Sequence, residues 1–428
     1  MPNVKETIVK IGWGEYAKSI NDVYPDNYDG HAARLAAAAE CFGREFGGER
    51  EITLFSASGR SEISGNHTDH QNGCAVAMAV DADVIAVVSL NDENAVRIKS
   101  EGFPLVEVSL ENLDVIENEK FTSNALVRGI ASYFSQNGYH IGGFDAYTTS
   151  TIPTGSGMSS SAAFEVLVAK ILSCLFNSDT VSPKELAICG RFAENNYFGK
   201  SCGLLDQLTI AYGGLLFMDF GDVCDVKAEN IDYDFNTSGY ELCIVNTGKG
   251  HGDLSDDYST ITSEMCSVAQ HFGCDTLKGI KKEQILENIN VLRDKCGDRA
   301  VIRSLNFIDE NKRANDVKNA LDAGDFSAFK RLILASGNGS YKYLQNVISP
   351  TRPSEQSLAL ALYLCEQQLK GRGAWRVHGG GFAGTIQAFL PLDMHNEFKA
   401  LMESVFGEGA CIFAKGRNIG AVQFTVSK

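Results

Sequence analysis

The stretch PTGSGMSSSAAFEV, residues 153–166, joins two glycines and three serines to the start of an apolar segment. Gly155 and Gly157 permit tight backbone turns close to a ligand. From Ser159 onward the pattern is apolar on most sides, so we predict a buried helix. The N-terminus of such a helix offers free N–H groups and a positive dipole end, which suit a phosphate, and serine hydroxyls can ligate Mg²⁺.

The alternative is a Gly/Ser loop in which a serine only caps the helix. The stretch is not a Walker A loop, because no G-K-[ST] follows the glycines. The combination of two glycines, three serines and a buried helix favours the phosphate loop over the cap.

The next informative stretch is AENNYFGKSCGLLDQ, residues 193–207. Glu194 lies near the end of a helix that we predict over 182–199, between a Ser-Pro start and a glycine stop. Asp206 is a carboxylate that directly follows two leucines, and a carboxylate in an apolar segment can act as a base or as an oriented charge. Alone, an aspartate solvated in a turn would be the better interpretation.

Two further stretches flank these. Residues 59–70, GRSEISGNHTDH, gather polar groups just before the apolar run 75–80. Residues 377–385, VHGGGFAGT, place three glycines between predicted strands, where backbones or a ligand can approach closely. His378 there is more typical of a packed or capping histidine than of a ligand.

Strands and helices are intermixed without a regular βα alternation, which predicts an α+β fold. We expect helices at 28–46 and 121–137, and two strands within 73–90 with a turn at Asp81–Asp83. The polar segment 226–240 is the best boundary, and it divides the chain into domains 1–225 and 226–428.

Composition narrows the function classes. The 428 residues include 38 Lys and Arg and 54 Asp and Glu, which gives a net charge of −16. This negative charge argues against a nucleic-acid partner. No apolar h-region or membrane-length run occurs, so we expect a cytoplasmic protein without a membrane partner. The 12 cysteines form no C-x-x-C pair, which favours reduced thiols over a zinc site.

In this order, the four stretches resemble the motifs of the GHMP kinases, and within that family those of the galactokinases. Residues 59–70 are similar to G-R-x-N-L-I-G-E-H-T-D-Y, and residues 153–163 to P-x-G-x-G-L-S-S-S-A. SCGLLDQ, residues 201–207, is similar to P-C-G-I-M-D-Q, and HGGGFAGT to a late G-G-G-F-G-G motif. The positions that match the first motif and its continuation are Gly59, Arg60, Ile63, Gly65, His67, Thr68, Asp69 and Gly73.

The resemblance implies the GHMP kinase fold, with an N-terminal ribosomal-protein-S5-like domain, a C-terminal ferredoxin-like domain and an active site between them. It implies ATP-dependent phosphorylation of galactose at the anomeric hydroxyl, with Mg²⁺ as cofactor, a small sugar as substrate and a monomer or weak homo-oligomer as the assembly. Asp206 and Arg60 match the catalytic residues, and Ser161 and Glu194 match the metal ligands. The nucleotide-binding positions are Gly155, Ser156, Gly157, Met158, Ser159, Ser160 and Ser161. The substrate-binding positions are Arg60, Asn66, His67, Asp69, Gly203, Asp206 and Tyr258.

Departures from the motif concern the substrate. Asn66 stands where the family has a Glu that bonds a sugar hydroxyl, SEIS replaces VNLI, and His70 replaces Tyr. We therefore expect either a high KM for galactose or a preference for a modified sugar. The alternatives are a kinase for a uronic, amino or deoxy sugar and a non-catalytic sugar sensor. Mevalonate and homoserine kinases share the phosphate loop but not GNHTDH.

Overall fold

Two sheets organise the protein, and the long strands β1 (Thr53–Ser64) and β2 (Cys74–Leu90) form the centre of the larger one. The computed structural model describes residues 1–428 except 154, 201, 223–224, 249–253 and 428. Within these residues the larger sheet has the order β12-β1-β2-β5-β3-β4, β6 pairs with the first part of β2, and β7 pairs with β6. Among the described strands of this sheet, only β3 and β5 pair in parallel. The other strands of this sheet are β3 (Ala95–Ser100), β4 (Leu105–Ser109), β5 (Phe144–Ser150), β6 (Leu215–Asp219), β7 (Lys227–Asn230) and β12 (Val422–Phe424).

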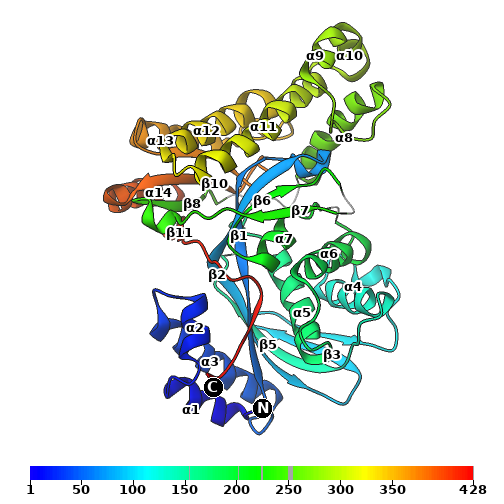
Figure 1. The fold of residues 1–428 in the computed structure, drawn as a ribbon, viewed down its shortest axis with the longest axis vertical. Coiled ribbons are helices and arrows are strands. Elements are labelled where there is room, and N and C mark those ends of the chain that lie inside the picture. The colour runs from blue at the N-terminus through cyan, green and yellow to red at the C-terminus, as the bar shows by residue number, and fades with distance from the viewer. Residues whose placement is uncertain (154, 201, 223–224, 249–253, 428) are drawn as a thin grey trace.

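The predicted turn at Asp81–Asp83 is wrong, because β2 runs through it as one strand. Asp83 is fully buried and forms ion pairs with Arg34 and Arg417, so the acidic residue needs no solvent-exposed turn. The register of β1 on β2 shifts between Ser58 and Gly59, opposite this segment. The pairing of β1 with β2 is thus locally irregular at this point instead of ending in a turn. Both strands continue as long strands through the larger sheet (Figure 1).

Helices cover both faces of the larger sheet (Figure 1). One face packs against α4 (Ser123–Gln136), α5 (Ser160–Phe176), α6 (Pro183–Ala193) and α7 (Leu205–Tyr212). The other packs against α1 (Val4–Gly12), α2 (Ala17–Val23) and α3 (Tyr28–Phe46). Side chains alternate between the two cores, since Leu54 belongs to the α1–α3 core and Phe55 to the α4–α7 core. The predicted helices at 28–46, 121–137 and 159 onward are confirmed.

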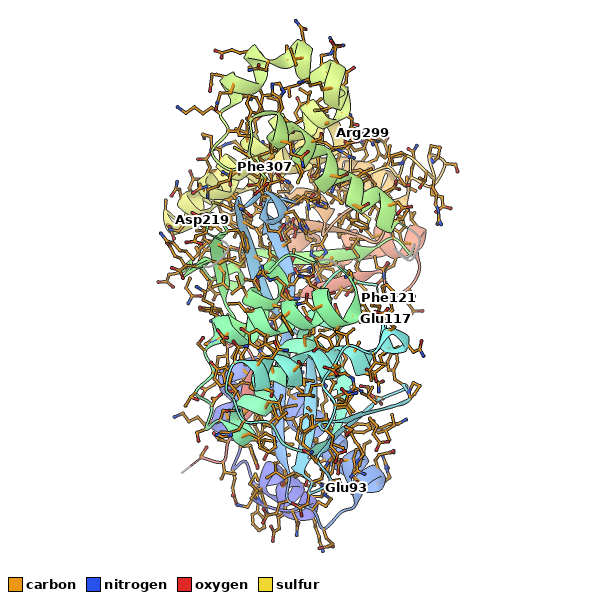
Figure 2. All side chains as sticks on the ribbon, turned by 90° about the vertical axis from the view of Figure 1, so that its right-hand side faces the viewer. Glu93, Glu117, Phe121, Asp219, Arg299 and Phe307 are labelled. Carbon is orange, nitrogen blue, oxygen red and sulfur yellow. The ribbon has the colours of Figure 1, made fainter. Side chains whose placement is uncertain are left out.

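The second sheet is antiparallel, with the order β11-β8-β10-β9. Its strands are β8 (Tyr240–Asn246), β9 (Ala374–His378), β10 (Thr385–Pro391) and β11 (Cys411–Ala414). The helices packed against it are α12 (Phe326–Gly339), α13 (Ser357–Leu369) and α14 (His395–Phe406). The helix α11 (Asp298–Asp322) packs instead against β1, β2 and β6 of the larger sheet, and it also packs with α8 (Ser255–His271), α9 (Lys282–Glu287) and α10 (Ile289–Cys296). In Figure 2, Phe307 on α11 lies in the upper part of the elongated molecule, and Glu93, just before β3, lies near its lower end.

The chain crosses between the two sheets more than once. β7 and β12 lie beyond residue 225, yet they pair with β6 and β1 of the larger sheet. The division into domains 1–225 and 226–428 therefore stays a prediction. The pairing of β12 with β1 shows that the C-terminal segment returns to the larger sheet.

Two chemical properties of the described residues bear on the sequence interpretation. None of their helices combines the length and the apolar character that a bilayer crossing requires. The eleven cysteines among them are free thiols, and Cys224 lies outside the described residues.

Candidate active site

The centre of the candidate site is an ion pair between β1 and α7. Arg60 projects from β1, and Asp206 lies in the first turn of α7. The guanidinium donates through Nε to Oδ1 and through Nη2 to Oδ2, both at 2.6 Å. Such a two-point contact fixes the orientation of the carboxylate as well as its charge. The two predicted catalytic residues therefore lie together.

The surroundings of Asp206 favour its charged form. Burial acts to raise the pKa of this carboxyl, but Arg60 and the Ser159 hydroxyl, which donates to Oδ2, together hold the pKa below its ordinary value. Asp206 is thus ionised at neutral pH, which makes it an oriented but weak base.

The predicted phosphate loop lies directly against this pair. Arg60 donates to the carbonyl of Gly157, and its backbone N–H donates to the carbonyl of Met158 at 3.2 Å. Gly157 has φ +69°, and a Cβ at this position would lie 2.8 Å from Thr385 Oγ1. Only glycine fits such a close, left-handed position. The loop therefore lies directly against the start of β10 in the second sheet.

The serines do not cap α5 in the way that the alternative interpretation requires. Ser159 precedes the helix with φ +58°, and its side chain donates to Asp206 instead of to the helix. The first-turn N–H groups of α5 have no side-chain cap, so they keep the capacity to bind an anion.

Glu194 lies in a network next to Asp206. The single π turn η3 (Glu194–Phe198) follows α6 and carries Glu194, whose side chain is almost fully buried. Its Oε1 accepts from Lys200 at 3.2 Å and its Oε2 from Gln207 at 3.1 Å. Gln207 Nε2 also donates to Glu165 at 3.0 Å. Burial, and then the charge of Glu194, raise the pKa of Glu165 well above its ordinary value.

Ser161 lies one helical turn before Glu165, and residues four apart share a helix face. Its hydroxyl is therefore on the side of α5 that faces this carboxylate network. Among the described residues, no group of three or more His, Cys, Asp or Glu side chains forms a ready metal cage.

Three of the predicted sugar-binding residues donate hydrogen bonds to the three glycines between β9 and β10. Asn66 Nδ2 donates to the carbonyl of Gly379 at 2.7 Å, His67 Nε2 to that of Gly380 at 2.9 Å, and Tyr258 Oη to that of Gly381 at 2.9 Å. A Cβ on Gly380 would lie 2.0 Å from the Tyr258 ring. The glycine stretch is thus a row of carbonyl acceptors that side chains can approach closely.

His67 is held as a neutral imidazole. A carbonyl can only accept, so Nε2 carries the proton in the bond to Gly380. Burial, with a smaller contribution from nearby His70, lowers the pKa of His67 to about 4. The ring is therefore uncharged at neutral pH, and its φ of +60° marks a tightly constrained position.

Asp69 approaches the segment that precedes Asp206. A Cβ on Gly203 would lie 1.9 Å from Asp69 Oδ2, so only glycine admits the carboxylate here. Asp69 Oδ1 accepts from the His70 backbone N–H at 3.0 Å. This contact joins the predicted sugar-binding residues to the segment that carries Asp206.

His378 is packed, as its sequence context indicates. It is buried, with Nε2 at 3.1 Å from Ser61 Oγ and Nδ1 at 3.0 Å from Thr385 Oγ1. Its contacts fasten β9 and β10 to β1.

Several residues of the site escaped the sequence analysis. Gln207 and Glu165 stand inside the quoted motifs, where their polarity in buried segments was the available signal. Arg376 and Asn346 come from segments without a motif, and only the fold brings them to Glu62 and Asn66.

Comparison with known proteins gives two matches to family descriptions. Residues 125–214 match the GHMP kinases N terminal domain, and residues 40–90 match the galactokinase galactose-binding signature. A galactokinase of Lactococcus lactis subsp. cremoris is 29% identical over 378 residues, covering 87% of this chain and 92% of the relative. A galactokinase of Glaesserella parasuis is 29% identical over 351 residues, covering 82% and 88%.

Solved structures share the fold. The galactokinase of Lactococcus lactis, crystallised with galactose, superposes with a TM-score of 0.77 at 24% identity and covers 91% of this chain and 99% of that one. A mevalonate kinase superposes with a TM-score of 0.60 at 15% identity, covering 86% and 99%. The predicted GHMP kinase fold is confirmed.

Proposed function

Since this chain belongs to the GHMP kinases, and within them to the galactokinases, we propose that it phosphorylates galactose at the anomeric hydroxyl with ATP. The products are galactose 1-phosphate and ADP. The observation that carries the proposal is the Arg60–Asp206 pair, which contacts the phosphate loop through both Gly157 and Ser159.

In the proposed step, the anomeric oxygen forms a bond to the γ-phosphorus while the bond from that phosphorus to the β,γ-bridging oxygen breaks. The bonding electrons leave with ADP, and the sugar proton passes to Asp206. Because Arg60 lowers the pKa of Asp206, this carboxylate accepts the proton late, when the new O–P bond has acidified the hydroxyl. Arg60 also offsets charge on the transferring group.

The nucleotide phosphates bind residues 155–161 in this proposal. The support is the uncapped N-terminus of α5, together with the close approach that glycine allows at Gly157. Ser159 would then link phosphate binding to proton transfer, since it belongs to the phosphate loop and its hydroxyl contacts Asp206.

Magnesium fits the residues beside the loop. Glu194 is a buried carboxylate next to Glu165, and buried Oε1 atoms of Glu165 and Gln207 have no hydrogen-bond partner in the described part of the chain. Mg²⁺ binds one or two protein oxygens plus phosphates and water, so it needs no three-residue cage. Ser161 and Glu194 would hold it, and its charge would neutralise the triphosphate.

The sugar is proposed to bind at Asn66, His67, Asp69, Gly203 and Tyr258, near the catalytic pair. The support is that the glycine carbonyls and the Asp69–Gly203 contact bring these residues together. A purely sensory role is not favoured, because the complete catalytic pair and phosphate loop are retained. Free cysteines are typical of a reducing compartment, which supports a cytoplasmic location, and we propose a monomer or weak homo-oligomer.

An ATP-consumption assay over a panel of sugars tests the proposal. Galactose is expected to give Mg²⁺-dependent ADP release and a sugar 1-phosphate identified by mass spectrometry. Turnover confined to a uronic, amino or deoxy sugar would reassign the substrate. Sugar binding without any ADP release would show a sensor instead of a kinase.

A further inference from the structure

Glu62 and Asn66 exchange the two residue types that the resembled motif carries. That motif has Asn where this chain has Glu62 and Glu where it has Asn66, four residues later. In the structure the two side chains are bonded to each other, Asn66 Nδ2 donating to Glu62 Oε1 at 3.0 Å. The exchange keeps one carboxylate and one amide in the pair and moves the charge from the loop to β1.

The hydrogen bonds of Asn66 leave it no free donor. Its two N–H groups are used by Glu62 and by the Gly379 carbonyl. Its Oδ1 accepts from Asn346 at 2.7 Å. An amide has two donors, so Asn66 cannot donate to a sugar without losing a bond to the protein.

Glu62 lies on the side of β1 that faces the reaction. The strand is regular from Arg60 to Glu62, and residues two apart on a strand share a face. Glu62 therefore points to the same side as Arg60, which holds Asp206. Arg60 and Asp69 both act electrostatically on Glu62, so the carboxylate lies within range of the catalytic and the sugar residues.

One oxygen of Glu62 is available. Oε1 accepts from Asn66 and from Arg376 Nη2, the latter at 2.9 Å. In the described part of the chain, Oε2 accepts no hydrogen bond, and the side chain keeps 11% of its surface exposed. An acceptor-only group in such a place suits a hydroxyl donor.

We propose that Glu62 is a specificity-determining residue that accepts a hydrogen bond from a sugar hydroxyl, replacing the glutamate of the motif, and that Asn66 holds it in position. This inference rests on the proposed sugar kinase activity and deepens it. It replaces the direct contact between Asn66 and the sugar that is proposed above by a positioning role for Asn66, and it differs from a purely structural Glu62–Arg376 ion pair.

The test compares three variants with the parent enzyme by steady-state kinetics, calorimetric galactose binding and thermal unfolding. For E62Q we expect KM and the dissociation constant for galactose to rise about 10- to 100-fold, the range of one charge-assisted bond, with kcat and the KM for ATP changed less than about threefold. For N66E we expect weaker sugar binding and a lower Tm, because two carboxylates would share one arginine. The double variant E62N/N66E restores the order of the motif and is expected to bind galactose within about threefold of the parent.

Asp83→Asn is the matched control, because Asp83 is another buried, arginine-paired carboxylate, and its side chain bonds Tyr24 and Arg34 on the α1–α3 side of the larger sheet. It should lower Tm without changing the KM for galactose. An unchanged KM in folded E62Q, or a lower KM in N66E alone, overturns the inference. Should E62Q fail to fold, failure of the double variant to regain binding overturns it. If the parent protein binds galactose but releases no ADP, the proposed function fails while calorimetry still decides the role of Glu62.

Discussion

Arg60 and Asp206, separated by 146 positions in the chain, form a two-point ion pair in which each carboxylate oxygen accepts one guanidinium hydrogen bond at 2.6 Å. The pair explains how this partly buried aspartate stays charged. It also sets a chemical limit, because the same arginine that orients Asp206 weakens it as a base.

Replacing Asp206 by Asn removes the proposed proton acceptor while preserving the shape of the side chain. We expect Asp206→Asn to lower kcat by about 10²–10⁴-fold, the usual contribution of a positioned base. ATP binding, measured by calorimetry, should be retained. Asp145→Asn alters a buried carboxylate paired with Arg50 and Arg97 and serves as control. Near-parental turnover of a folded Asp206→Asn protein would contradict the assignment.

Replacing Arg60 by Met should move the pH profile of kcat. Burial would then raise the pKa of Asp206 without the opposing arginine, so a larger fraction of the carboxyl would be protonated at acid pH. We expect the acid limb of the kcat profile to shift to higher pH and the maximum rate to fall. An acid limb at the parental position would show that the pKa of Asp206, as lowered by Arg60, does not set the acid limb of the kcat profile.

Glu194→Gln tests the proposed magnesium position. Loss of its charge should raise the Mg²⁺ concentration needed for half-maximal rate and lower kcat, with little change in galactose binding. Glu165→Gln is the comparison, because burial raises the pKa of Glu165 and the amide resembles the neutral acid. A Mg²⁺ requirement that responds more to Glu165→Gln than to Glu194→Gln would relocate the metal.

Gly203→Ala tests the approach of Asp69. The added Cβ would lie 1.9 Å from Asp69 Oδ2, and the end of that side chain can rotate away. We expect the KM for galactose to rise at least about tenfold, as for loss of a charge-assisted bond, while Tm changes by only a few degrees. Gly12→Ala, where a Cβ meets nothing within 4 Å, should change neither. A parental KM in Gly203→Ala would place Asp69 outside the sugar site.

His67 should make stability depend on pH between about 6.5 and 4. Its pKa is about 4 in the folded protein against an ordinary value of 6.5, so in this window the unfolded chain binds a proton that the folded protein does not. The free energy of unfolding should therefore fall as pH is lowered through the window, by about 3 kcal/mol at most. Urea titrations of the parent and His67→Asn check this; an equal slope in both would contradict it.

The sequence by itself determined several of the helices and the motifs. The apolar character of 160–176 and the Ala-rich pattern of 28–46 lead to the helices observed, because side-chain periodicity is a local property. The glycines at 157, 380 and 381 marked where other atoms approach the backbone closely. Asp206 and Arg60 were also identified from the sequence, through their motifs.

Only the tertiary structure decided which polar groups are already engaged. The acidic segment Asp81–Asp83 stays within β2 because Arg34 and Arg417 arrive from distant elements to pair with Asp83. Asn66 is saturated by Gly379 and Asn346, and Glu62 is paired with Arg376, although no local pattern connects these residues. A hydrogen bond consumes a particular donor and a particular acceptor, so the availability of a side chain for substrate depends on contacts that form only when the chain has folded.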